Sequence, residues 1–378
     1  MPIPARTLLL LMILSGLPAL ASAQSSTLTG SSRSMNPAIS VNGLIRGQVS
    51  RDNPTGDLNG FKVDGVELQF TSVVDPFWKA NFNIGMHPAH AHDGEEDGHS
   101  EGMVVHVEEG FIDGQSLPGG WGLKVGKFAL PFGKHAPLHM HQFPFSDAPV
   151  VIASFIGDHI FSDTGAMVTV TVPVPWYADF RIYGVNGDAM PFDAHNKNLA
   201  GGGRLTNLWD MTEDATLEAS GSFLHGPDAR HPGENKTVDM YGVDLTWKWV
   251  SSARTRGPAL HMTVEAVLPD YEEGEGDPWG WYGLAQYRFN RNWWAGIGAG
   301  QADAGLDHHE EVPGHEDHDH GLEGDLWEYK VNLTFVPSEF SSLRAEMVYY
   351  QDKVTMEDDL RFIVQANFTI GSHPAHLY

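Results

Sequence analysis

The sequence predicts an all-β fold: a transmembrane antiparallel up-and-down β-barrel of about sixteen strands, preceded by a signal peptide. Three observations lead to this fold class: an export signal, strand-length segments of alternating polarity, and connections that are alternately short and long. In a spanning barrel, alternate side chains face lipid and lumen, and short periplasmic turns oppose longer extracellular loops. No segment after the export signal has the roughly 18 consecutive apolar residues typical of a spanning helix.

The first 23 residues have the three parts of a signal peptide. Arg6 supplies the positive charge, residues 8–14 form a short apolar core, and Ala21-Ser22-Ala23 is a small-residue cleavage site. We therefore expect a signal peptide over 1–23, a flexible lead-in over 24–37 and the outer-membrane β-barrel over 38–378. An uncleaved membrane anchor is the alternative for the first segment.

The composition excludes several classes of protein. The chain has 49 acidic and 23 basic residues and a net charge of −26, so it is a poor partner for nucleic acid. It has no cysteine, which excludes disulfides and thiolate metal sites. Its 42 glycines and 11% aromatic residues are typical of an ordered, turn-rich β fold.

Alternation is the main signal for strands. Within 326–336 one face is apolar, with Trp327, Tyr329, Val331, Leu333 and Phe335, and the other is polar, with Glu328, Lys330, Asn332 and Thr334. The pattern predicts strands over 38–50, 61–73, 76–86, 103–113, 120–130, 162–173, 176–186, 199–208, 213–225, 236–250, 257–269, 278–289, 292–301, 324–336, 341–352 and 359–371. An even number of strands places both termini in the periplasm. Tryptophans near the predicted strand ends are typical of the aromatic girdles of such barrels.

The polar faces of these strands carry many charged residues. A soluble core could not bury them without a large desolvation cost, so they indicate a water-filled lumen in which they stay solvated. The inward-facing set is Lys124, Arg181, Arg204, Asp244, Lys248, Arg288, Glu328, Lys330, Arg344, Glu346 and Arg361. The acidic residues are concentrated in the loops, which predicts that the mouth attracts cations.

Three short motifs carry a resemblance to a known family. They are residues 35–43 (Met-Asn-Pro-Ala-Ile-Ser-Val-Asn-Gly), 123–134 (Leu-Lys-Val-Gly-Lys-Phe-Ala-Leu-Pro-Phe-Gly-Lys) and 368–371 (Phe-Thr-Ile-Gly). With the overall plan, they resemble the Gram-negative porins, and most of all the porin-like barrels grouped with the phosphate-selective porins O and P. The chain departs from that pattern at its end, where residues 372–377, including Pro374, precede Tyr378. No residues match a phosphate site, so the phosphate preference is not carried over.

Histidine supplies the distinctive chemistry. The chain has 20 histidines, and most lie in or beside predicted long loops among Asp and Glu residues. Imidazole and carboxylate groups bind Zn²⁺, Cu²⁺ and Ni²⁺, and without thiolates we expect several weak, exchanging sites. The predicted ligands are His87, His90, His92, His99, His308, His309, His315, His318 and His320. Other histidines, His135, His139, His141 and His159, lie in the loop that follows the fifth strand.

Two other interpretations of these histidines stay open. The loops are either solvated surface, or they bind Ca²⁺ or Mg²⁺ beside lipopolysaccharide. Within a strand, His106 and Glu108 share one face, and an inert pair in the lumen is favoured there over a metal site.

The sequence thus predicts a Gram-negative outer-membrane porin, without enzymatic activity, through which small solutes diffuse and whose loops bind a divalent transition metal, zinc first. No cofactor is required, although zinc or another divalent metal binds weakly. The expected partners are outer-membrane lipid, lipopolysaccharide and small solutes or metal ions. We expect a homotrimer only because porins are commonly trimers. One alternative is a general or anion-selective porin with incidental histidines, and another is a non-conducting surface metal-binding protein.

Overall fold

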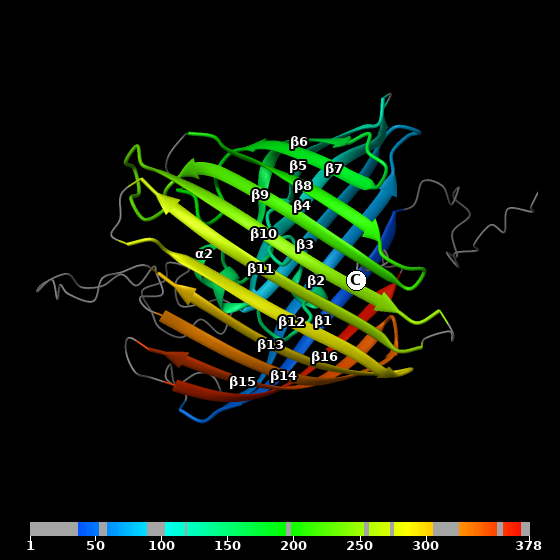
Figure 1. The fold of residues 1–378 in the computed structure, drawn as a ribbon, viewed down its shortest axis with the longest axis vertical. Coiled ribbons are helices and arrows are strands. Elements are labelled where there is room, and N and C mark those ends of the chain that lie inside the picture. The colour runs from blue at the N-terminus through cyan, green and yellow to red at the C-terminus, as the bar shows by residue number, and fades with distance from the viewer. Residues whose placement is uncertain are drawn as a thin grey trace, which may run out of the picture. The chain divides into compact units, whose positions relative to one another are not determined.

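The structure, a computed structural model, describes residues 37–52, 59–88, 103–117, 119–193, 198–252, 257–272, 276–304, 325–353 and 358–371. These residues form a closed barrel in which each strand pairs antiparallel with the next and β1 closes on β16 (Figure 1). The strands are β1 (Ala38–Ser50), β2 (Gly60–Val73), β3 (Lys79–Pro88), β4 (Met103–Leu117), β5 (Trp121–Ala129), β6 (Ser162–Thr171), β7 (Tyr177–Val185), β8 (Ala200–Asp210), β9 (Ala215–Pro227), β10 (Thr237–Val250), β11 (Ala259–Tyr271), β12 (Trp279–Asn290), β13 (Trp293–Asp303), β14 (Asp325–Ser338), β15 (Ser341–Asp352) and β16 (Asp358–Gly371). The predicted all-β barrel is confirmed.

Alternation along the strands determines which side chains face outward. In β14, Tyr329, Val331 and Leu333 are exposed on the outer surface, whereas Glu328 and Lys330 are buried inside. A barrel with an apolar outside and a polar inside matches the spanning pattern that the sequence predicts. Among the described residues, no helix is long and apolar enough to cross a membrane.

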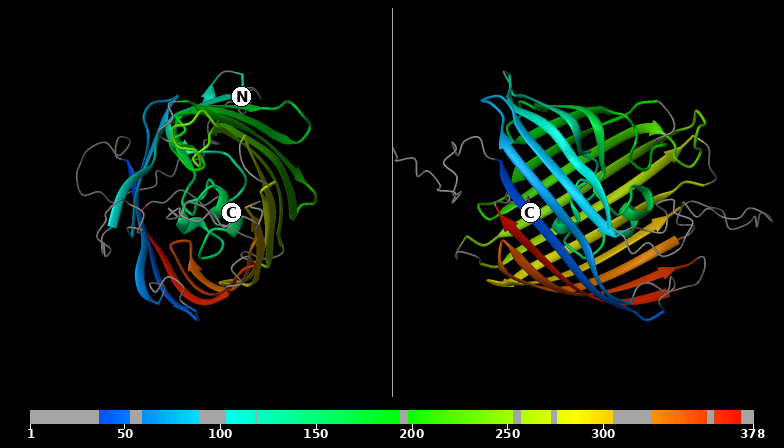
Figure 2. Two further views of the ribbon diagram at one scale, coloured as in Figure 1. Left: turned by 90° about the vertical axis from the view of Figure 1, so that its left-hand side faces the viewer. Right: turned by 180° about the vertical axis from the view of Figure 1, so that it is seen from behind.

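The connection between β5 and β6 folds into the barrel. This luminal segment, residues 130–161, contains η2 (Met140–Gln142) and α2 (Val150–Phe155) and lies within the ring of strands (Figure 2). Its apolar side chains form a core with inward-facing residues of the wall, so that the lumen contains a hydrophobic centre. The core includes Phe132, Phe143, Val151, Phe155, Leu224, Met240 and Tyr282.

Buried charges on the wall hold the middle of the luminal segment. Arg46 of β1 pairs with Asp147 at 2.6 Å and donates to the carbonyl of Ser146 at 3.0 Å. On β14, Lys330 donates to the carbonyl of Ala148 at 3.0 Å. The same segment is bound from β15 as well, where Glu346 accepts the Ser146 amide at 3.0 Å.

These contacts correct one expectation. The inward-facing charges were expected to be solvated, but Arg204, Asp244, Glu328, Lys330 and Glu346 are buried. The luminal segment covers part of the wall and supplies backbone partners there, and Arg204 pairs with Asp244 at 2.6 Å. Burial of a charge is tolerated where hydrogen bonds and an opposite charge replace water.

The start of the luminal segment has its own anchor. Glu265 of β11 accepts the backbone amide of Lys134 at 2.8 Å, and Lys134 Nζ pairs with Glu218 at 2.6 Å. Gly133 has a φ of +62°, and a Cβ there would collide with the Glu265 carboxylate. Both the backbone conformation and the space therefore require glycine at this position.

We predict that Gly133→Ala destabilises the folded barrel by about 1–3 kcal/mol, because alanine would have a strained φ and would displace Glu265. Guanidinium unfolding in detergent, followed by tryptophan fluorescence, measures this. Gly221→Ala is the matched control, since a Cβ at Gly221 meets nothing within 4 Å. Equal unfolding midpoints for the two variants would contradict the anchor.

Candidate functional site

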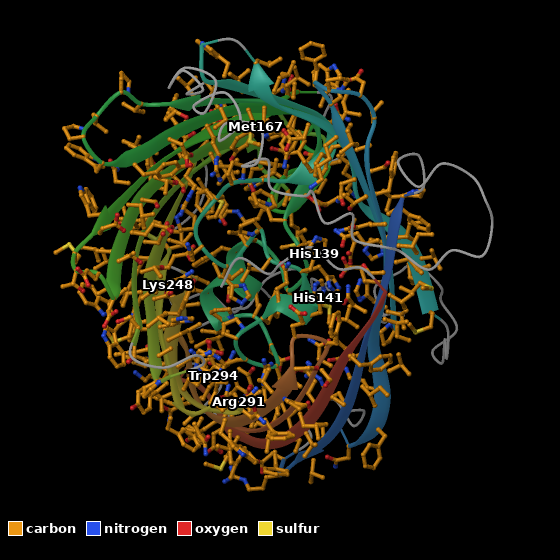
Figure 3. All side chains as sticks on the ribbon, turned by 90° about the vertical axis from the view of Figure 1, so that its right-hand side faces the viewer. His139, His141, Met167, Lys248, Arg291 and Trp294 are labelled. Atoms are coloured by element: carbon orange, nitrogen blue, oxygen red, sulfur yellow. The ribbon has the colours of Figure 1, made fainter. Side chains whose placement is uncertain are left out.

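Histidines and glutamates from three strands and the luminal segment meet on one side of the lumen. We call this group the luminal His/Glu cluster. Figure 3, a view along the barrel, shows two of its members, His139 and His141, inside the ring of strands. Its members are Glu67 of β2, His87 of β3, His106, Glu108 and Glu109 of β4, and His139, His141 and His159 of the luminal segment.

A β-bulge turns two adjacent glutamates inward. The register between β3 and β4 shifts so that Asn83 faces Glu109 while Ile84 faces Val107, which leaves Glu108 as the extra residue. Glu108 and Glu109 are only 5% and 8% exposed, although neighbouring strand residues normally point to opposite faces. The bulge thus concentrates negative charge at one place on the wall.

Glu108 lies at the centre of the cluster. Its Oε1 is 2.8 Å from His87 Nε2 and 3.8 Å from His106 Nε2. The nearby Gly85 leaves room for this contact, because a Cβ there would collide with the Glu108 carboxylate and approach His87 Nε2 to 2.8 Å. The rings of His87 and His159 lie 4.9 Å apart, which brings the luminal segment to the same place.

His139 joins the three carboxylates. Its Nδ1 lies 3.0 Å from Glu108 Oε2 and 3.4 Å from Glu67 Oε1, and its Nε2 lies 3.2 Å from Glu109 Oε2. Burial lowers the pKa of the His139 imidazole, but the charge of Glu67 and the hydrogen bonds to Glu108 and Glu109 outweigh burial. They hold the pKa well above its ordinary value. The contact of His139 Nδ1 with Glu108 Oε2 limits how the Glu108 carboxylate can turn.

A cavity of about 840 Å³ lies beside the cluster, and His87 and His159 line it. Seven aspartates and three basic residues, Arg46, Lys62 and Arg361, also line this cavity. The aspartates are Asp52, Asp64, Asp147, Asp158, Asp352, Asp358 and Asp359. The cavity is therefore net negative and would attract cations.

The structure changes the setting of one predicted metal ligand. His87 was expected in a loop, but it lies in β3 and faces the lumen with Asn81 and Asn83, because the strand continues to Pro88. The other predicted ligands, His90, His92, His99, His308, His309, His315, His318 and His320, lie outside the described residues. Their role remains a prediction.

The sequence did not predict that Glu67, Glu109 and His139 lie in one cluster with His106 and Glu108. Alternation could have placed Glu67 on the inward face, since it shares a strand face with Gln69 and Thr71. Nothing in the sequence indicates the bulge that turns Glu109 inward, or the path that brings His139 across the lumen.

Comparisons with known proteins agree on the architecture. No family model matches the chain. A protein of Aquifex aeolicus (strain VF5), described only as uncharacterized, is 28% identical over 363 residues, which cover 85% of this chain and 71% of that protein. That relative carries no functional information.

The solved structures that this chain resembles include porins and other outer-membrane proteins. OprB of Pseudomonas putida has a TM-score of 0.61 at 9% identity and covers 89% of this chain and 94% of its own. An anion-selective porin from Comamonas acidovorans has a TM-score of 0.57 at 10% identity, and the match covers 89% of this chain and 100% of that porin. The trimer form of OmpT, an outer-membrane protein of Vibrio cholerae, has a TM-score of 0.50 at 9% identity. The match covers 89% of this chain and 100% of the OmpT chain.

At these identities the similarity concerns the fold, and it confirms the resemblance to porin-like barrels. With its closed barrel, apolar outer surface and polar interior, the chain has the fold of the Gram-negative outer-membrane porins, which supports the predicted location in the outer membrane.

Proposed function

We propose that the chain is a diffusion channel for small polar solutes, rather than an enzyme, and that the luminal segment sets its width. The observation that carries this proposal is the cavity of about 840 Å³ between the luminal segment and the barrel wall, lined by charged side chains. Charged and polar groups lining a space inside a closed barrel are the normal setting of a channel.

The excess of aspartates around this cavity supports a cation preference. The anion preference printed for the Comamonas acidovorans porin belongs to that protein, and the seven aspartates against three basic residues in this chain support the opposite preference. A general or anion-selective porin remains the alternative for the pore.

Metal binding by the loops is a further part of the proposal. His90, His92, His99 and the five histidines of 308–320 are interleaved with carboxylates, a composition that binds zinc and similar ions. The proposal has three further parts. The chain is exported through the signal peptide 1–23, it contacts outer-membrane lipid and lipopolysaccharide, and it assembles as a homotrimer. The trimer form described for Vibrio cholerae OmpT supports the last point. A non-conducting surface metal-binding protein is the alternative from another class.

Removing the luminal segment should widen the channel. We expect replacement of 136–158 by a short Gly-Ser linker to raise single-channel conductance in KCl by about twofold or more, since the segment occupies the lumen. The double variant Glu328→Gln with Lys330→Met removes two anchors of the luminal segment but keeps the segment itself. We expect its single-channel current to fluctuate rapidly, with an open level equal to that of the parent. No conductance in the parent itself would overturn the channel and favour the surface protein.

Ion selectivity gives a second test. In a KCl gradient across a planar bilayer, the reversal potential should show a cation preference that decreases in Asp158→Lys, because Asp158 lines the cavity and its side chain is 62% exposed. Asp210→Lys, at the end of β8 and outside that lining, is the matched control. A reversal potential of the anion-selective sign in the parent would contradict the proposed preference.

Acid should weaken one anchor of the luminal segment within a defined pH range. Burial raises the pKa of the Asp147 carboxyl, but the charge of Arg46 outweighs it and lowers the pKa from 3.8 to about 2. The stabilisation, up to about 2 kcal/mol, is complete above about pH 5 and is lost as the pH falls through about 2. The difference in unfolding free energy between the parent and Asp147→Asn should therefore be constant from pH 7 to pH 5 and then shrink. A difference that already shrinks between pH 7 and pH 5 would rule out this anchor.

A further inference from the structure

The carboxylates of the luminal His/Glu cluster are paired differently from those elsewhere in the lumen. Among the described residues, the ion pairs of Glu67, Glu108 and Glu109 are all with histidines. Elsewhere in the lumen, Asp244 pairs with an arginine, Arg204, and Glu328 pairs with a lysine, Lys330. Histidines compensate buried carboxylates only when protonated, and they are the commonest metal ligands when neutral.

The nitrogen and oxygen atoms around Glu108 are spaced as metal ligands are. His87, His106 and Glu108 each offer one ligand atom, and these three atoms lie within 4.8 Å of one another. Glu108 Oε1 lies 2.8 Å from His87 Nε2 and 3.8 Å from His106 Nε2. Ligands of a tetrahedral ion with bonds of about 2.0–2.1 Å lie roughly 3.3 Å apart, so small side-chain movements would let all three bind one ion. His106 is the most exposed of the three, with its side chain 38% exposed, and it has the most freedom to adjust.

From this geometry we propose that His87, His106 and Glu108 form a site for a divalent transition-metal ion on the wall of the lumen. Imidazole and carboxylate groups without thiolate favour zinc and its neighbours over Ca²⁺ or Mg²⁺, which prefer ligand sets made only of oxygen. Three protein ligands leave one position open on the cavity side, for water or for His159. Such a site binds its ion weakly enough to exchange it, which suits a channel.

The surroundings of the three ligands are those of a built site. His139 Nδ1 lies 3.0 Å from Glu108 Oε2, the oxygen that does not face His87, and so holds the carboxylate in place. Gly85 leaves the space that Glu108 and His87 occupy. Because His87 lines the cavity of about 840 Å³, an ion can reach the ligands from the lumen.

This site is separate from the proposed loop sites and does not depend on conduction. The test therefore uses the full chain, without an affinity tag, in a background where the loop ligands are silenced. In that background asparagine replaces His90, His92, His99, His308, His309, His315, His318 and His320. Co²⁺ absorption reports tetrahedral coordination, and Zn²⁺ displaces the Co²⁺ to give the affinity.

We expect one bound Co²⁺ per chain with tetrahedral absorption in this background, and at least tenfold weaker binding in His106→Gln and in Glu108→Gln. His225→Asn is the matched control, because His225 also pairs with a carboxylate, Asp239, at 2.7 Å but lies outside the cluster. It should bind Co²⁺ as the background does. His106→Gln changes a partly exposed side chain, and its folding is checked by the guanidinium midpoint.

Each other outcome has a definite meaning. No bound Co²⁺ in the background, or equal binding in His106→Gln, would overturn the luminal metal site and leave an inert pair. A barrel that conducts but does not bind Co²⁺ would leave the channel proposal standing. A barrel that binds Co²⁺ at this site but does not conduct would leave the metal site standing and remove the channel.

Discussion

The structure depends on the buried charges that hold residues 130–161 inside the barrel. Sixteen strands enclose a lumen too wide for the wall side chains alone to fill, so an inserted segment must satisfy its backbone polar groups there. Lys330 binds the carbonyl of Ala148, and its partner Glu328 accepts the Val150 amide at 2.8 Å. The pair is neutral as a unit. Glu328 accepts from a backbone amide and Lys330 donates to a backbone carbonyl, which is why both charges can be buried.

The position of this segment divides the lumen unequally. Its apolar side chains form a core with inward-facing residues of β6 to β13, among them Leu224, Met240 and Tyr282. The polar half, toward β1 to β3 and β14 to β16, contains the cavity and its aspartates. The luminal His/Glu cluster lies where the segment meets this open half, so the packing of the core also determines where solutes and ions can meet the wall.

Much of the barrel could be predicted from the sequence, because strand alternation is local. The polar and apolar faces of 326–336 assign Glu328 and Lys330 to the inside and Tyr329 to the outside, as the structure confirms. The luminal segment could not be predicted, since its contacts join residues about 100 to 200 positions apart, as from Arg46 to Asp147 or from Ser146 to Glu346. The bulge at Glu108 breaks the period on which the prediction depends, and the end of β3 at Pro88 moved His87 from an expected loop to the wall.

Luminal carboxylates are paired either with arginine and lysine or with histidine, and the kind of partner distinguishes pairs that stabilise the fold from pairs that can also bind a metal. An arginine or lysine side chain has no lone pair to offer a metal ion while it is charged, so Arg204 beside Asp244 and Lys330 beside Glu328 are suited to compensating charge within the fold. If compensation were the only need at Glu67, Glu108 and Glu109, one arginine would meet it with more hydrogen bonds than an imidazole can make. Several histidines stand there instead, and a histidine can give up its proton and offer a lone pair to an ion. The bulge and the space at Gly85 place these groups at the edge of the cavity, where an incoming ion could reach them.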